Sequence, residues 1–215
     1  ENNSRETQNE QSTPFDNIHD ENSIPISYFD VDFESLLSQN SDCVGWIRIL
    51  GTNINFPIVQ TQNNDYYLNH NIAKESNGAG WIFADYRNNF EELNQNTIIY
   101  GHNRRNGTMF SNLKYYLDEN FCAYEEHKYI NFNTLNKQYI AEVFSAYKIS
   151  ANNSSINTDY ESYTEFSKII QDWKNKSVYN FNVDVDETDN ILTLYTCDNN
   201  TSYRILLHAK IIPIN

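Results

Sequence analysis

Eight short apolar runs, separated by turn-forming residues, constrain the fold of this 215-residue chain more than any other feature of its sequence. The first two runs flank "GTN" at 51–53, which predicts a β-hairpin. A series of short strands of this kind favours a closed or nearly closed barrel, rich in antiparallel pairs, over a fold of alternating strands and helices. The predicted strands are 44–50, 54–60, 79–85, 96–102, 128–134, 137–150, 190–197 and 203–214.

Two segments depart from the strand pattern because their apolar residues recur at helical spacing. Phe33, Leu36 and Leu37 predict a short helix ahead of the first strand, and Asp30 is its candidate N-cap. Between the sixth and seventh predicted strands, one face of 158–177 is apolar, which predicts a helix of about four turns lying across the barrel. The residues of that face are Tyr160, Tyr163, Phe166, Ile169, Ile170 and Trp173.

The beginning of the chain differs in composition from the rest. Residues 1–25 are polar and rich in Asn, Gln and Glu, so we expect a flexible tail or stalk there. A chain of 215 residues suits one folded domain with a sizeable core, and we assign residues 26–215 to it. Because the sequence begins at Glu1 without a methionine, we also expect that an N-terminal membrane anchor preceded it.

The net charge and the cysteine count exclude several classes of protein. A formal net charge of −14 argues against binding nucleic acid or an anionic membrane through a basic surface. No window approaches the roughly 20 apolar residues of a membrane-spanning helix, and no signal-peptide pattern begins at Glu1. Cys43, Cys122 and Cys197 form no CxxC pair, which supports neither a zinc ribbon nor a disulfide framework. For Cys43 and Cys122 we expect small buried side chains.

Cys197 differs from the other two cysteines because it ends an apolar run and is followed by polar residues. A thiol becomes a useful nucleophile when it is deprotonated beside a basic or cationic group. His102 ends another predicted strand, and Arg204 begins the last strand, which returns from Cys197 through a short loop. Taken singly, each residue also suits a structural role, as a buried thiol, a strand-end histidine or a solvated charge.

Alternation along the last predicted strand separates two faces. The even-numbered residues of 204–210 lie on one face and the odd-numbered residues of 205–211 on the other. The odd-numbered residues are all apolar, so we expect that face to pack in the core. Arg204 is then available to a groove on the other face.

Two strings carry a resemblance to a known family. "TLYTC" at 193–197, followed by an arginine and an apolar strand, resembles the TLxTC…R signature of sortases, and "YGHN" at 100–103 resembles the segment that carries their histidine. Several other stretches resemble class B sortases in particular. They are "VGWIRILGTNINFPIVQ", "NDYYLNHN", "TIIYGHN", "GTMFSNL" and the long helix before the cysteine strand. The similarity runs over about residues 28–213. It implies a mainly β fold, the sortase eight-stranded β-barrel, with an N-terminal helix and a long helix between strands 6 and 7.

The resemblance also implies a reaction. Sortases are cysteine transpeptidases on the outer face of the plasma membrane of Gram-positive bacteria. They cleave a C-terminal sorting motif after threonine, hold the acyl group as a thioester, and transfer it to an amine of the cell wall or of a pilin. In this chain Cys197 is then the nucleophile, His102 exchanges protons with the leaving and incoming amines, and Arg204 stabilises the oxyanion.

The substrate groove is implied by the same resemblance. Asn64 and Leu68 match positions that line the groove for the sorting motif in relatives, although a short structural helix would explain them equally well. Tyr195, Thr196 and Asp198 border the nucleophile. The position of Asp198 is acidic in class B relatives, whereas that of Tyr195 is often serine, which bears on substrate preference and not on the chemistry. We expect neither a metal nor a cofactor, since no carboxylate cage is evident.

Two other functions fit the same residues. A cysteine hydrolase would use Cys197 and His102 but transfer the acyl group to water. A β-barrel binding domain would bury Cys197 and leave its thiol unreactive. The resemblance favours the transpeptidase, for which the expected partners are surface proteins with a sorting motif and a peptidoglycan precursor or a pilin that supplies the amine.

Overall fold

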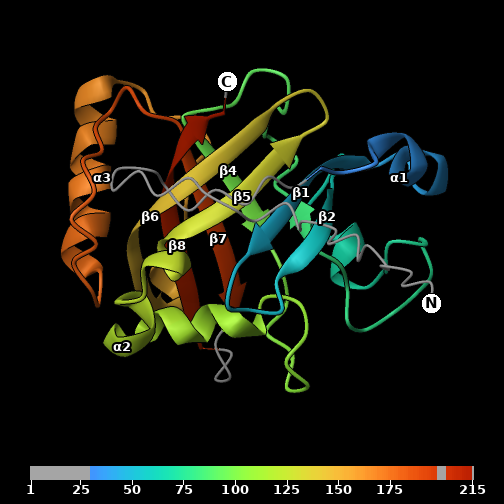
Figure 1. Ribbon diagram of the computed structural model, residues 1–215, viewed down its shortest axis with the longest axis horizontal. Coiled ribbons are helices and arrows are strands. Elements are labelled where there is room, and N and C mark those ends of the chain that lie inside the picture. The colour runs from blue at the N-terminus through green and yellow to red at the C-terminus, as the bar shows by residue number, and fades with distance from the viewer. Residues whose placement is uncertain (1–29, 198–201, 215) are drawn as a thin grey trace, which may run out of the picture.

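Eight strands form a closed barrel in the order β1-β2-β3-β4-β7-β8-β6-β5 (Figure 1). The computed structural model describes residues 30–197 and 202–214. The predicted eight-stranded, mainly β fold is therefore confirmed, and the expected tail at 1–25 lies outside the described residues. The strands are β1 Cys43–Ile49, β2 Asn55–Val59, β3 Phe83–Ala84, β4 Asn96–Tyr100, β5 Tyr129–Thr134, β6 Gln138–Ser150, β7 Ile191–Cys197 and β8 Tyr203–Pro213.

The predicted hairpin joins β1 and β2. Trp46 lies opposite Pro57 in an antiparallel register, and the Ile49 amide donates to the Ile54 carbonyl over 2.9 Å. Gly51 turns the chain with a φ of 72°, a left-handed conformation that glycine adopts without strain. The "GTN" signal thus predicted this connection correctly.

Two of the strand pairs are parallel. β2 runs parallel to β3, and β4 runs parallel to β7 with Tyr100 opposite Tyr195. The other six pairs of the barrel are antiparallel. Since neighbouring parallel strands end at the same rim, the residues that follow β4 and β7 emerge side by side.

The barrel interior holds the main hydrophobic core, and β8 shows how one strand serves two cores. Ile205, Leu207 and Ala209 are fully buried inside the barrel. Leu206 and His208 point to the outer face, where a helix covers them and they are buried as well. The predicted separation of faces is confirmed. Arg204 lies at the open end of this outer face and is half-buried.

The N-terminal helix α1 spans Phe33–Gln39, and its N-cap is Asp32, so the prediction of Asp30 is wrong. The Asp32 carboxylate accepts a hydrogen bond of 2.9 Å from the Ser35 amide. That amide belongs to the first turn, whose N–H groups have no partner within the helix, and a carboxylate two residues earlier in the chain would not reach it. The remaining short helices are η1 Tyr66–Leu68, η2 Ser111–Leu117, α2 Glu119–Cys122, η3 Glu125–Lys128 and η4 Ala151–Asn153.

The predicted long helix is α3, Tyr163–Lys176, which lies along the side of the barrel beside β6 (orange in Figure 1). Phe166, Ile170 and Trp173 are its buried residues. Tyr163 is 64% exposed, so its assignment to the apolar face is wrong. It is the first residue of the helix. In the part of the chain described, no helix is both long and apolar enough to cross a membrane.

His208 lies under α3 and is fully buried. Its ring stacks on Trp173 with centroids 4.0 Å apart. The Thr193 hydroxyl donates to Asn96 Oδ1, so Nδ1–H of His208 donates to the Thr193 oxygen over 2.8 Å, and Nε2 accepts from the Tyr147 hydroxyl over 3.1 Å. Burial, reinforced by the positive charge of Lys176, holds the pKa of His208 well below its usual value of 6.5.

This neutral histidine predicts a loss of stability in mild acid. Unfolding exposes His208, which then takes up a proton when the pH is below its unfolded pKa of about 6.5. The unfolded state therefore binds more protons than the folded state, and the free energy of unfolding decreases as the pH is lowered. The contribution is fully present above that pKa and decreases by up to about 1.4 kcal/mol per pH unit below it. Urea unfolding at pH 5.0 and 7.5 measures the effect. In His208→Gln, which cannot titrate, the difference between the two pH values is expected to be smaller; an equal difference would contradict the assignment.

Candidate active site

The ends of three neighbouring strands bring the three candidate catalytic residues to one rim of the barrel. His102 and Cys197 each lie two residues beyond a paired tyrosine, Tyr100 on β4 and Tyr195 on β7. The Gly101 amide donates to the Tyr195 carbonyl over 3.2 Å and extends this parallel pairing toward His102. On the other side of β7, Arg204 of β8 lies directly opposite Cys197.

A groove of about 320 Å³ opens at this rim. The structure describes the backbone of Cys197, and Asp198 lies outside the described residues. All six of the other residues predicted for the site line the groove: Asn64, Leu68, His102, Tyr195, Thr196 and Arg204. The prediction missed three further lining residues, Phe83, Tyr100 and Gly101. Tyr100 and Gly101 adjoin His102 in "YGHN", which is the signal that could have found them, whereas Phe83 begins β3 and no motif marks it.

His102 is held by the backbone of the segment that contains η1. Its Nε2 lies 2.9 Å from the Leu68 carbonyl oxygen. A carbonyl oxygen only accepts, so this bond needs a proton on Nε2, and in the neutral ring Nδ1 is then the acceptor. Gly80 permits the close approach, because with a φ of 60° a Cβ there would lie 2.9 Å from both the Leu68 oxygen and His102 Cδ2. The ring orientation is thus set by residues distant in sequence.

Arg204 is the second residue of β8 and lines the groove. Its backbone pairs with Ile149 of β6 and with Cys197 of β7, so the guanidinium starts from a strand held on both sides. Nη1 donates to the Tyr203 carbonyl over 3.0 Å. A half-buried guanidinium with several donors at this place can stabilise developing negative charge on an oxygen.

The groove wall next to these residues is aromatic and polar. The rings of Tyr100 and Tyr195 meet edge to face at 5.2 Å. The Tyr195 hydroxyl shares a 2.7 Å hydrogen bond with Ser154, which lies just after η4. Thr196 is buried, and its hydroxyl has no hydrogen-bond partner among the residues that the structure describes. The wall therefore offers an aromatic surface to a peptide, while the Thr196 hydroxyl is covered.

The other two cysteines lie in the interior, as expected. Cys43 and Cys122 are 1% and 0% exposed. Burial, followed by the nearby Asp42 carboxylate, raises the pKa of Cys43. Burial, followed by Asp118 and Glu119, raises the pKa of Cys122 to about 11. A buried thiol with a raised pKa is protonated and inert near neutral pH.

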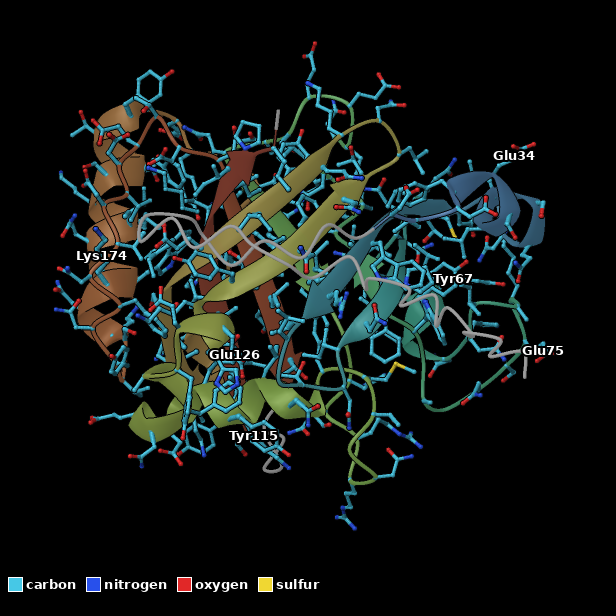
Figure 2. The ribbon with its side chains drawn as sticks, in the orientation of Figure 1. Glu34, Tyr67, Glu75, Tyr115, Glu126 and Lys174 are labelled. Atoms are coloured by element: carbon cyan, nitrogen blue, oxygen red, sulfur yellow. The ribbon has the colours of Figure 1, made fainter. Side chains whose placement is uncertain are left out.

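Outside the rim, clusters of potential ligands are scarce. No group of three or more His, Cys, Asp or Glu side chains that could hold a metal ion occurs in 30–197 or 202–214, within the limits of the side chains described. Figure 2 shows Lys174 projecting from α3 on one side of the molecule, while Tyr67, next to the groove residue Leu68, lies on the other.

Comparison with known proteins identifies the class of protein that this barrel and site define. The family model for the sortase domain matches residues 47–212, which is most of the chain. The chain belongs to the sortase family.

Its relatives define the class within the family. Sortase B of Staphylococcus aureus is 42% identical over 186 residues, covering 85% of this chain and 75% of the relative. Sortase B of Listeria monocytogenes is 40% identical over 184 residues, covering 84% and 74%. A solved sortase B–substrate complex from Staphylococcus aureus superposes with a TM-score of 0.80 at 42% identity, covering 85% of each chain. The protein is a class B sortase, a cysteine transpeptidase, as the resemblance predicted.

Proposed function

We propose that Cys197, His102 and Arg204 divide the transpeptidase reaction among nucleophile, proton carrier and oxyanion stabiliser. The observation that carries the proposal is the register of β4, β7 and β8, which brings the three residues to adjacent strand ends. Asn64, Leu68, Tyr195, Thr196 and Asp198 then form the binding site for the sorting motif.

The first half of the reaction cleaves the sorting motif. Starting from the Cys197 thiolate and a His102 ring that carries protons on both nitrogens, the sulfur attacks the carbonyl carbon of the motif's threonine, the C–N bond breaks, and the departing amine takes a proton from His102. The product is a thioester that links the threonine acyl group to Cys197. The backbone register that pairs Cys197 with Arg204 supports a role for Arg204 beside the nucleophile.

The second half transfers the acyl group. An incoming amine loses a proton to His102 and attacks the thioester carbon, and the cysteine thiolate leaves. The hydrogen bond to the Leu68 carbonyl keeps the imidazole in one orientation through both halves. Because His102 returns to its starting protonation state, one residue serves as acid first and as base afterwards.

Arg204 is suited to the tetrahedral intermediate because its charge is permanent and its donors form a rigid fork. Arg204→Lys is therefore expected to lower kcat/KM about a hundredfold or more, since a single ammonium does not reproduce that geometry. Steady-state cleavage of a sorting-motif peptide measures the loss. Arg105→Lys, at an exposed position after His102, is the matched control and should be silent. Full turnover by Arg204→Lys would refute the role given to Arg204.

The substrates follow from the class and the groove. The donor is a surface protein with a C-terminal sorting motif, bound along the Tyr100 and Tyr195 wall. The acceptor is an amine of a peptidoglycan precursor or of a pilin. Such acceptors place the enzyme at the outer face of the plasma membrane of a Gram-positive bacterium, with residues 26–215 as the catalytic domain and 1–25 as a stalk.

Intact-mass spectrometry tests the proposed function directly. The protein is incubated with peptides that carry Pro-x-Thr-Gly or Asn-Pro-x-Thr-x motifs, with and without triglycine as the added amine. We expect a mass increase equal to the acyl fragment, and a product that contains triglycine when the amine is present. Cleavage unaffected by triglycine would identify a hydrolase instead, and the absence of an adduct with every motif would refute the proposed donor.

A further inference from the structure

A fully buried carboxylate lies directly behind the groove wall. Asp85 follows β3 and is 0% exposed, and its two oxygens accept five hydrogen bonds. Three come from Arg87: its amide at 3.0 Å and Nε at 2.8 Å to Oδ1, and Nη2 at 2.8 Å to Oδ2. The other two reach Oδ2, from the Tyr100 hydroxyl at 2.9 Å and from Asn64 Nδ2 at 3.0 Å.

The charge state of Asp85 determines how its partners are oriented. Burial alone would raise the pKa of Asp85, but the hydrogen bonds from Arg87 and Tyr100 outweigh it and lower the pKa below its usual value. The ionised carboxylate can only accept, so Tyr100 and Asn64 must both donate to it. Asn64 Oδ1 in turn accepts from the Tyr86 amide over 3.0 Å, which prevents the side-chain amide from rotating by 180°.

The two groups oriented in this way both line the groove. After donating to Asp85, the Tyr100 hydroxyl oxygen still has acceptor capacity, and Asn64 Nδ2 still has a second proton to donate. One acceptor and one donor on the same wall match the N–H and C=O groups of an extended peptide. Arg87 alone already neutralises Asp85, so the charge balance of the interior does not require these two additional bonds.

We propose that Asp85 is a positioning residue for substrate recognition, which orients Asn64 and Tyr100 so that they present a donor and an acceptor to the peptide backbone of the sorting motif. Asp85 itself touches no substrate, because it is fully covered. The inference rests on the proposed function only in taking the groove as the donor site. Asp85 is thus added as a buried residue that orients two residues of the groove wall.

The network also reaches the segment between β6 and α3. Arg87 Nη2 donates to the Ile156 carbonyl over 3.3 Å, and Ser154 in the same segment bonds to Tyr195. Both tyrosines of the wall are thus tied to one framework, Tyr100 through Asp85 and Tyr195 through Ser154. A change at Asp85 is expected to alter the wall and to leave the reacting residues at the strand ends in place.

Kinetics of Asp85→Asn with the Asn-Pro-x-Thr-x peptide test this proposal. The side-chain amide that this substitution introduces has one oxygen and cannot accept hydrogen bonds at both positions of the Asp85 carboxylate oxygens. We therefore expect KM to rise about tenfold, with kcat changed less than about threefold. Iodoacetamide is small and does not depend on the binding groove. The rate at which it alkylates Cys197 should therefore stay unchanged. In an Asn64→Ala background the same substitution should have a clearly smaller effect, because one of the two groups that Asp85 orients is already lost. Full additivity, or an unchanged KM, would overturn the proposal.

Two controls separate positioning from folding. Asp189→Asn removes a carboxylate that pairs with Lys210 at 3.0 Å before β7, at the opposite end of that strand from the groove, and should leave KM unchanged. If Asp85→Asn fails to fold, the double variant Asp85→Asn with Arg87→Met leaves no unpaired guanidinium and is expected to show the same rise in KM. An unaltered KM in that variant also counts against the proposal.

A readout independent of turnover distinguishes failure of this inference from failure of the proposed function. In nitrogen-15 spectra the Asn64 side-chain amide signals are assigned by their loss in Asn64→Ala. We expect their hydrogen exchange to be about tenfold faster in Asp85→Asn than in the wild type. Unchanged exchange would overturn the positioning role even if the peptide is turned over, whereas faster exchange without turnover of any peptide would refute only the proposed donor.

Discussion

Cys197→Ala is expected to abolish the acyl adduct and to lower amine-dependent product formation by at least about a thousandfold, because no other described thiol can replace the nucleophile. The backbone of Cys197 ends β7 opposite Arg204 and next to the strand end that leads to His102. Intact-mass spectrometry and product analysis measure the two losses in the same incubation. The thermal unfolding midpoint should stay within a few degrees of the wild type, because the substitution removes one sulfur atom at a strand end.

The buried cysteines are the matched controls for this prediction. Cys43→Ala and Cys122→Ala remove thiols of the same size from the interior, where a raised pKa keeps them protonated. Both variants are expected to form the adduct at the wild-type rate, with a modest loss of stability from the small cavity. An adduct that persists in Cys197→Ala and disappears in one of these variants, without unfolding, would show that the nucleophile is a different thiol.

His102→Ala is expected to lower kcat/KM for peptide cleavage by about a hundredfold to ten-thousandfold, which is the usual contribution of a positioned acid and base. The imidazole lines the groove and is oriented by the Leu68 carbonyl at 2.9 Å. Without it, the departing amine must take its proton from water and the incoming amine must lose its proton to water. Steady-state cleavage of a sorting-motif peptide measures the loss.

His70 supplies the control for the removal of an imidazole. It also bonds to a backbone carbonyl, with Nδ1 2.8 Å from the Tyr66 oxygen, and its ring stacks on Tyr66 at 4.0 Å. It does not line the groove. His70→Ala should therefore retain most of the activity while losing a comparable set of contacts. Equal losses in the two variants would indicate that His102 acts through packing rather than proton transfer.

Local patterns predicted the elements because each depends on residues close together in the chain. The eight apolar runs became the eight strands, the period of three and four residues became α3, and the even and odd residues of β8 separated as expected. Errors arose where contact with distant elements decides the outcome. Tyr163 has helical spacing, but it is exposed, whereas Phe166 three residues later is buried.

The candidate site was predicted only in part, because short strings identify residues and not their neighbours. "TLYTC" and "YGHN" led to Cys197, His102 and Arg204, and six of the predicted residues do line one groove. The pairing of β4 with β7, which joins residues almost a hundred positions apart, has no local signal. Neither has the buried bond network of Asp85, whose carboxylate meets Asn64 and Tyr100 only in the folded chain.

The sequence by itself determined the strands, the long helix and the family, because hydrophobic periodicity and short motifs are properties of neighbouring residues. The tertiary structure alone decided which strand ends meet, how the Leu68 carbonyl and Gly80 orient His102, and which carboxylate holds the groove wall. The physical reason is that these contacts join segments far apart in the chain. Their geometry depends on the register and closure of the whole barrel, which no local pattern specifies.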